Sequence, residues 1–134
     1  MGSRILIILD THIWIWFNLT PDRLPTSILD LFLLGGGEFG ISAITVWETV
    51  LAAQKGRIEV PNSPEENARA WLAASPIQVF PIDVEVALLA RTLPFEHSDP
   101  ADRFIAATAF HLGCPLVTVD DQLRKLSWLD VLPK

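Results

Sequence analysis

Short apolar segments alternate along this chain with segments of helical character, and this alternation constrains its fold more than any other feature. The apolar segments at 5–9, 39–43, 77–82 and 114–119 are too short for helices and read as buried strands. A further small strand is expected near 129–132. Strands that alternate with helices favour a parallel sheet covered on both faces. The pattern therefore predicts an α/β fold with a parallel sheet of about four to five strands.

The helical segments carry ordinary start and stop signals. Ser63 followed by Pro64 starts one helix, Asp83 caps another, and the glycines at 35–37 and at Gly113 end two more. No linker is long enough to divide the chain, so we expect a single domain over 1–134. The expected helices are 11–17, 26–34, 44–55, 64–74, 83–93, 100–112 and a short one after Asp120.

Composition limits the classes of function. Half of the 134 residues are hydrophobic, which is enough for one domain with a core. The net charge of −6 counts against a simple nucleic-acid binder, so any such role needs a local site or a bound cation. No apolar run has the length of a membrane span, so no membrane partner is expected. The single cysteine, Cys114, suits a reducing cytoplasm.

Two acids lie where this architecture places its ligand sites. The stretch ILIILDTHIWIWF at 5–17 runs from a predicted strand directly into Asp10, and Asp120 follows the last long apolar segment. In open parallel sheets, ligands bind at the carboxyl ends of the strands. Asp120 alone is equally well explained as the N-cap of the last helix, with Asp121 in its first turn.

Glu48 is an acid on an expected helix. At 100° per residue it shares a face with Ile44, Trp47 and Leu51, which predicts that it lies in an apolar stripe. An ionised carboxylate there needs a partner, a proton or a metal. The alternative is a Glu at the edge of the stripe that reaches solvent or pairs with Lys55 or Arg57, and this alternative stays open.

Asp102 has two interpretations as well. Pro100 suits the first position of a helix, which makes Asp99 the natural N-cap and places Asp102 at the third position. An acid there stabilises the helix start. Asp102 nevertheless shares a face with Ile105 and Ala106, and so points toward the packed side.

The four acids together suggest a metal site. If Asp10, Glu48, Asp102 and Asp120 converge, a hard cation such as Mg²⁺ or Mn²⁺ offsets their repulsion and provides local positive charge for a phosphate. Thr11 and Thr118, beside these acids, are candidates for positioning water or phosphate through their hydroxyls.

Other chemistries fit less well. A haloacid-dehalogenase-type phosphatase needs an acid two residues after Asp10, where His12 stands. The histidines at 12, 97 and 111 lack zinc spacing. No nucleophilic triad and no glycine-rich phosphate loop is signalled. His97 is a weak candidate for substrate contact.

Four segments resemble the PIN domain, and within it the VapC-type toxins of bacterial toxin–antitoxin pairs. They are LDTHIWIW at 9–16, ISAITVWETVLAAQKGRI at 41–58, LPFEHSDPADRFIAATA at 93–109 and LVTVDDQL at 116–123. The resemblance covers nearly the whole chain in the correct order. It implies a three-layer sandwich, with a short parallel sheet between helices.

The resemblance also implies an activity and partners. By it, Asp10, Glu48, Asp102 and Asp120 correspond to the acidic quartet that binds Mg²⁺ or Mn²⁺ in metal-dependent endoribonucleases. RNA is then the substrate, with Arg103, Lys55 and Arg57 as candidates for phosphate contact. An antitoxin would block the site through a hydrophobic groove, and a homodimer is the usual form.

Two alternatives to this function remain. The chain could be a catalytically silent binding module with the same fold, or a metal-dependent phosphatase.

Trp14, Trp16 and Phe17 lie on one short predicted helix that cannot bury three rings alone. We expect some of this aromatic surface in a dimer or antitoxin interface.

Overall fold

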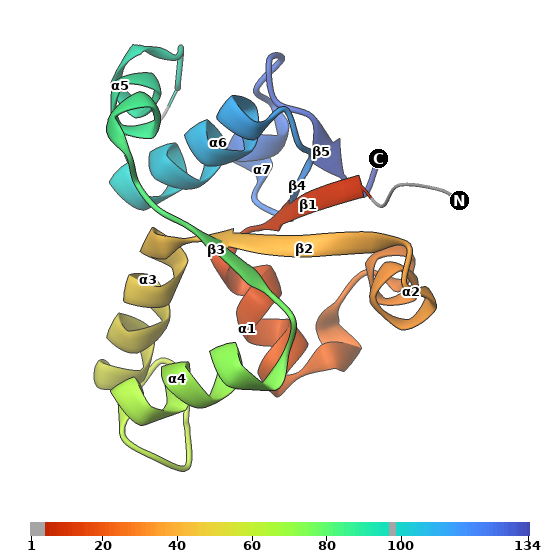
Figure 1. Cartoon of the computed structure of the whole chain (residues 1–134), viewed down its shortest axis with the longest axis vertical. Coiled ribbons are helices and arrows are strands. Elements are labelled where there is room, and N and C mark those ends of the chain that lie inside the picture. Colours follow the sequence, from red (N-terminus) through yellow and green to blue (C-terminus); the bar gives the residue numbers. More distant parts are fainter. Residues whose placement is uncertain (1–4, 97–98) are drawn as a thin grey trace.

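A parallel sheet lies at the centre of the computed structural model, which describes residues 5–96 and 99–134 (Figure 1). Its five strands run in the spatial order β3-β2-β1-β4-β5, and every neighbouring pair is parallel. The predicted parallel α/β sheet is thereby confirmed, including the small strand near the end of the chain. The strands are β1 (Ile5–Leu9), β2 (Gly37–Ser42), β3 (Gln78–Phe80), β4 (Leu116–Val117) and β5 (Val131–Leu132).

The helices lie close to their predicted positions. A short 3-10 helix spans Pro21–Arg23. None of the helices within the described ranges has both the length and the hydropathy of a membrane span. The helices are α1 (Thr11–Leu19), α2 (Thr26–Leu34), α3 (Ala43–Gln54), α4 (Pro64–Ala74), α5 (Val84–Thr92), α6 (Pro100–Leu112) and α7 (Asp121–Arg124).

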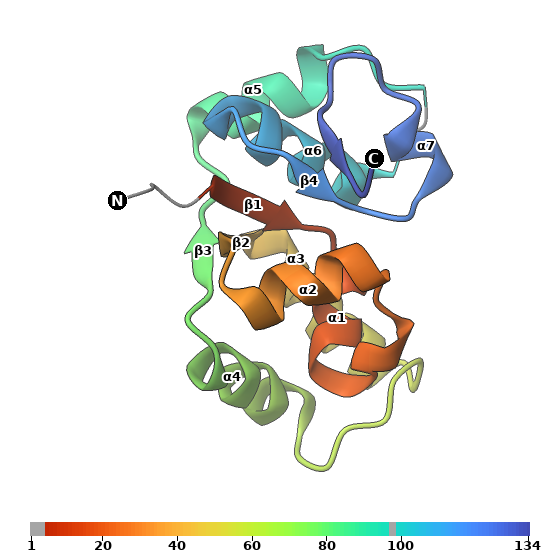
Figure 2. The ribbon, with the colours of Figure 1, turned by 90° about the vertical axis from the view of Figure 1, so that its right-hand side faces the viewer.

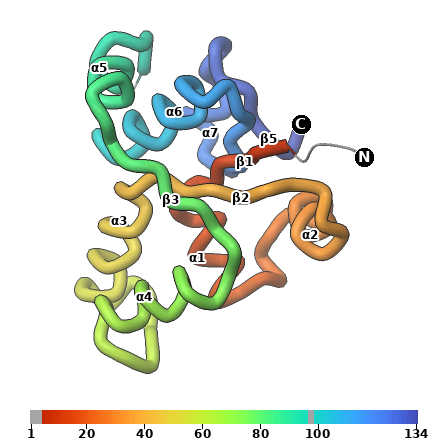
Figure 3. Tube along the Cα trace, viewed as in Figure 1, coloured from red at the N-terminus to blue at the C-terminus, as the bar shows by residue number. Residues whose placement is uncertain are grey.

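Helices cover both faces of the sheet, as the three-layer sandwich requires. Successive side chains of β1 alternate between the faces. Ile7 and Leu9 pack in a core with residues of α1 and α2, whereas Ile8 packs in a second core with residues of α6 and α7. Figure 2 shows these two helical layers from the side, and Figure 3 shows β3 carrying the chain from α4 across to α5. The sheet is therefore packed against helices on both of its faces.

Strand β2 begins earlier than predicted. Gly35 alone ends α2, because its φ of 69° gives the left-handed conformation of a helix C-cap. Gly37 already pairs with Ile5 in the sheet, where a Cβ atom would lie 2.9 Å from the Ile7 Cδ1 atom. The glycine run thus serves both the helix end and a close strand contact, and only the first role was predicted.

Strands β3 and β4 are shorter than predicted. The segment at 114–119 contributes only Leu116 and Val117 to the sheet, since the next residues turn toward the start of α7. Thr118 still donates its backbone N–H to the Leu132 carbonyl at 3.1 Å, which is within the usual range of an N–H···O hydrogen bond. After this change of direction, the Thr118 side chain binds the carboxylate of Asp10.

The aromatic residues of α1 differ in how deeply they are buried. Trp14 is fully buried and meets Trp71 of α4 edge to face, with 5.6 Å between ring centroids. Phe17 packs against Phe32 of α2, 4.4 Å away. Trp14 therefore belongs to the core and not to an interface, because α2 and α4 cover the helix.

Asp99 is the N-cap of α6, and its contribution to stability can be measured. Its Oδ1 atom accepts the Ala101 backbone N–H at 3.0 Å. We predict that Asp99→Ala is less stable than Asp99→Asn by about 0.5–2 kcal/mol, because asparagine keeps the cap and alanine loses it. Both variants remove the charge, so urea unfolding of the pair isolates the cap. Equal unfolding free energies would contradict the assignment.

Candidate functional site

Asp10 is a buried carboxylate at the end of β1 with 4% of its surface exposed. It caps α1, and its Oδ1 atom accepts the Thr11 backbone N–H at 2.8 Å. Its Oδ2 atom accepts the Thr118 hydroxyl at 2.7 Å. Burial raises the pKa of Asp10, the two hydrogen bonds and the charge of His12 lower it, and Asp120 raises it. Asp10 therefore lies at the carboxyl end of β1, as predicted, and its hydrogen bonds offset part of the effect of burial on its pKa.

Glu48 lies near Asp10, but the predicted apolar stripe around it is wrong. Trp47 is 59% exposed, and the buried positions of α3 are Thr45 and Thr49. The Thr11 hydroxyl donates to Glu48 Oε1 and lies 3.1 Å from the Thr45 hydroxyl. The inward face of α3 is therefore polar at this level, and hydroxyl groups position the Glu48 carboxylate.

The ionisation of Glu48 is also shifted. Burial raises its pKa most, the Thr11 hydrogen bond lowers it, and the carboxylates of Asp10 and Asp99 raise it further. The charge of His12 lowers it. The charge of Asp10, at the end of β1, thus affects the ionisation of Glu48 on α3.

Asp102 lies in the first turn of α6 and is half-buried. Burial and the negative charges of Asp10, Asp99, Asp120 and Glu48 raise its pKa to about 8. The inward interpretation is therefore supported, since the other three candidate acids all act on it. Asp99, assigned only to capping from the sequence, also contributes to this repulsion.

Asp120 has the capping role that the sequence predicted, and it also acts electrostatically on two of the other candidate acids. Its Oδ1 atom accepts the backbone N–H groups of Gln122 at 2.9 Å and Leu123 at 3.0 Å, so it caps α7. Its charge also raises the pKa of Asp10 and Asp102. Asp121 is exposed in the first turn of α7.

The acids share one region without forming a ready-made cation cage. Within residues 5–96 and 99–134, no three side chains of Asp, Glu, His or Cys lie close enough to enclose a metal ion. The donor chemistry still fits Mg²⁺ or Mn²⁺, because the mutually repelling groups are all carboxylates and both ions prefer oxygen. Binding would require these side chains to draw closer together.

The residues predicted to contact substrate have different neighbours in the structure. The hydroxyls of Thr11 and Thr118 bind Glu48 and Asp10, and so they position acids. The Arg103 guanidinium donates to the Ala90 carbonyl of α5 at 3.1 Å and lies 4.8 Å from the Phe95 ring centroid.

The other basic candidates lie at or beyond the end of α3. Lys55 is exposed as the C-cap of α3. Arg57 lines a pocket together with Glu48. His97 lies outside the described residues, so its proposed contact is untested.

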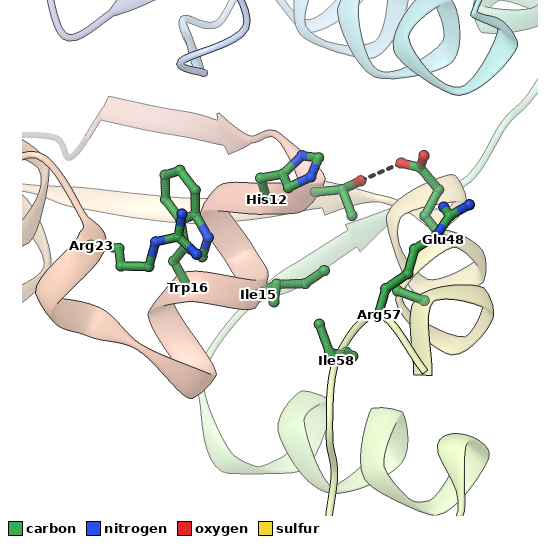
Figure 4. Close-up of a pocket in the computed structure, with 9 residues that line it drawn as sticks. His12, Ile15, Trp16, Arg23, Glu48, Arg57 and Ile58 are labelled. Atoms are coloured by element: carbon green, nitrogen blue, oxygen red, sulfur yellow. Dashed lines mark hydrogen bonds between the residues drawn. The ribbon is translucent and has the colours of Figure 1, made fainter. Parts of the chain in front are cut away.

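The pocket beside Glu48 was not anticipated from the sequence. It has a volume of about 230 Å³ and joins α1, the 3-10 turn, α3 and the segment after α3 (Figure 4). Thr11, His12, Ile15 and Trp16 recur at the spacing of one helix face, which is the signal that could have revealed one wall. The lining residues are Thr11, His12, Ile15, Trp16, Arg23, Glu48, Ala52, Arg57 and Ile58.

Similar proteins were found by sequence and by structure. Ribonuclease VapC22 from Mycobacterium tuberculosis is 32% identical over 121 residues, which cover 88% of this chain and 89% of that protein. VapBC2 from Rickettsia felis, solved with a promoter DNA fragment, matches with a TM-score of 0.70 at 20% identity over 95% of this chain and 97% of that one. FitAcB from Neisseria gonorrhoeae matches with a TM-score of 0.59 at 25% identity, over 93% of this chain and 95% of that one.

These matches agree with the resemblance seen in the four sequence segments. The solved structures share the arrangement of sheet and helices described above. The model of the PIN domain matches residues 7–129, which include all four candidate acids. The chain belongs to the PIN domain family.

Proposed function

We propose that this chain is a metal-dependent endoribonuclease and the toxin of a toxin–antitoxin pair. The observation that carries the proposal is the electrostatic coupling of Asp10, Glu48, Asp102 and Asp120, which come from separate elements at the carboxyl edge of the sheet. The relative with 32% identity is a ribonuclease, which supports RNA as the substrate. Several structural neighbours are toxin–antitoxin complexes, which supports an antitoxin partner.

In this mechanism the four acids would hold one or more Mg²⁺ or Mn²⁺ ions. A bound cation supplies positive charge that acidifies a water molecule and neutralises charge on a phosphate. Thr118 and the Thr11 backbone fix the Asp10 carboxylate from two sides. The Thr11 hydroxyl engages Glu48 Oε1, which leaves Oε2 to accept a proton from the attacking water.

Partner surfaces are part of the same proposal. An apolar groove of about 360 Å³ is lined by the rings of Phe17, Phe32 and Phe39 and suits an antitoxin segment. Val84 and Leu88 of α5 are 75% and 54% exposed, and they are candidates for a homodimer contact. We place the complex in the cytoplasm.

A catalytically silent binding module is the alternative that one observation favours. The described acids do not enclose a cation site without rearrangement. Titration with Mn²⁺ separates the two functions: a silent module would cleave no RNA at any metal concentration, whereas the proposed nuclease gains activity. A phosphatase would release phosphate from a monoester instead.

Asp102→Asn should change the pH dependence of stability in the metal-free protein. The pKa of Asp102 is about 8 in the folded chain and about 4 in an unfolded chain. The unfolded chain therefore loses this proton first, and stability falls as pH rises from about 4 to about 8. The variant should lose this contribution and have a shallower decline, as measured by urea unfolding in EDTA at several pH values.

The same variant should lose RNA cleavage although it folds at least as well as the parent near neutral pH. Asp130→Asn is the matched control, because Asp130 is exposed and pairs with Lys134 away from the acid cluster. An active Asp102→Asn chain, or an unchanged pH profile of its unfolding free energy, would exclude Asp102 from the acid cluster.

Metal removal and end-group analysis test the chemistry. EDTA should abolish cleavage of RNA by the full chain, and Mg²⁺ or Mn²⁺ should restore it. Attack by water leaves a 5′-phosphate and a 3′-hydroxyl, whereas attack by the ribose 2′-hydroxyl leaves a cyclic phosphate. Cyclic products, full activity in EDTA, or an Asp10→Asn variant as active as the parent would each reject the mechanism.

A further inference from the structure

The pocket beside Glu48 combines an aromatic ring, apolar walls and two arginines. In Figure 4, Trp16 and Arg23 lie on one side of it, Arg57 and Glu48 lie on the other, and Ile15 and Ile58 lie between them. The Thr11 hydroxyl at its rim binds Glu48, so the pocket is continuous with the acid cluster. A group bound in the pocket would therefore lie directly beside the proposed reaction site.

The charge of the pocket differs from that of the whole chain. The chain has a net charge of −6, yet Arg23 and Arg57 both line this one hollow. In the described part of the chain, ion pairs join Arg69 to Glu65 and Lys134 to Asp130, and neither pocket arginine takes part in one. Both guanidinium groups are thus available to an anion, and Arg is suited to phosphate.

The shape of the pocket favours a small flat group. Its volume of about 230 Å³ lies below the roughly 300–1,000 Å³ of sites for drug-sized ligands. The Arg23 guanidinium carbon lies over the Trp16 ring, 4.6 Å from its centroid, so the ring and the cation form one stack at the pocket wall. Proteins bind unpaired bases by stacking them on aromatic rings and on Arg planes. A protein helix would need a longer groove.

We propose that this pocket binds the nucleotide next to the scissile phosphate in single-stranded RNA. Trp16 with Arg23 stacks on the base, Ile15 and Ile58 contact its edge, and Arg57 binds the adjoining phosphate. The proposal rests on the ribonuclease function above and adds the residues that select the substrate. An antitoxin segment is the competing occupant, and its occupancy is an outcome of the test below.

The first experiment measures RNA binding by the full chain with Asp10→Asn, which prevents cleavage. The probe is a short fluorescein-labelled single-stranded RNA of random sequence, with Mg²⁺ present. Adding Trp16→Leu should weaken binding on the order of tenfold, as expected for loss of one stacked base, while Trp16→Phe keeps most of the affinity. Adding Arg57→Gln should weaken binding and reduce the salt slope by about 0.7. Arg91→Gln, at an exposed site on α5, is the control for charge.

The second experiment maps cleavage sites with Asp10 intact. Trp16→Leu should keep cleavage but flatten the base preference at one position beside the cut, and Trp16→Phe should restore it. Unchanged affinity and an unchanged cleavage pattern in Trp16→Leu and Arg57→Gln would overturn the subsite and leave the pocket to an antitoxin segment. The ribonuclease function would stand in that case, since the parent still cleaves. A parent that neither binds nor cleaves the RNA would remove both proposals.

Discussion

The hydrogen bonds of Asp10 hold the two ends of the chain together at the site. The Thr118 hydroxyl that binds its Oδ2 atom is 108 residues away, and the backbone N–H of Asp10 donates to the Val117 carbonyl. A buried carboxylate without partners would favour its protonated form and destabilise the folded chain. Because Thr118 and the start of α1 both bind this carboxylate, β1, β4 and α1 are fixed relative to one another, and the other acids are placed around it.

The same burial strengthens the repulsion between the neighbouring carboxylates, which a bound cation would offset. Burial and the neighbouring carboxylates raise the pKa of Asp10, Glu48 and Asp102, to about 8 for Asp102. Under the proposed function, metal binding would release protons from these carboxyl groups and draw them together. The negative net charge of the chain would repel the proposed RNA substrate, but this repulsion is screened beyond about 8–10 Å at ordinary salt. Under the proposed function, local positive charge from a cation and from Arg57 would therefore decide whether a phosphate can approach.

Periodicity in the sequence predicted the parallel sheet, because short apolar strands and helix caps are local signals. Asp10 was placed correctly for the same reason, since it follows β1 directly. Glu48 was chosen from a face containing Trp47, which is exposed. The inward face contains Thr45, whose hydroxyl meets that of Thr11, and Thr49, whose hydroxyl donates to the Thr45 carbonyl, and a helical period of apolar residues does not reveal such polar buried positions. The pocket beside Glu48 could not be predicted either, because Arg57 and Ile58 lie beyond the end of α3, where no period relates them to Trp16.

Helix starts explain why an acidic cluster can exist here before any cation binds. Asp10 caps α1, Asp99 and Asp102 lie at the start of α6, and Asp120 caps α7. In a parallel α/β sheet, the strands lead into helices at the carboxyl edge, so positive helix ends gather there. Each end stabilises a nearby carboxylate by about 0.3–1 kcal/mol, and α7 with its single turn contributes least. These contributions do not cancel the effects of burial and of the neighbouring carboxylates on Asp102, whose pKa remains about 8. Capping and metal binding are therefore compatible uses of the same residues: capping fixes the position of each acid, and the remaining repulsion favours a cation among them.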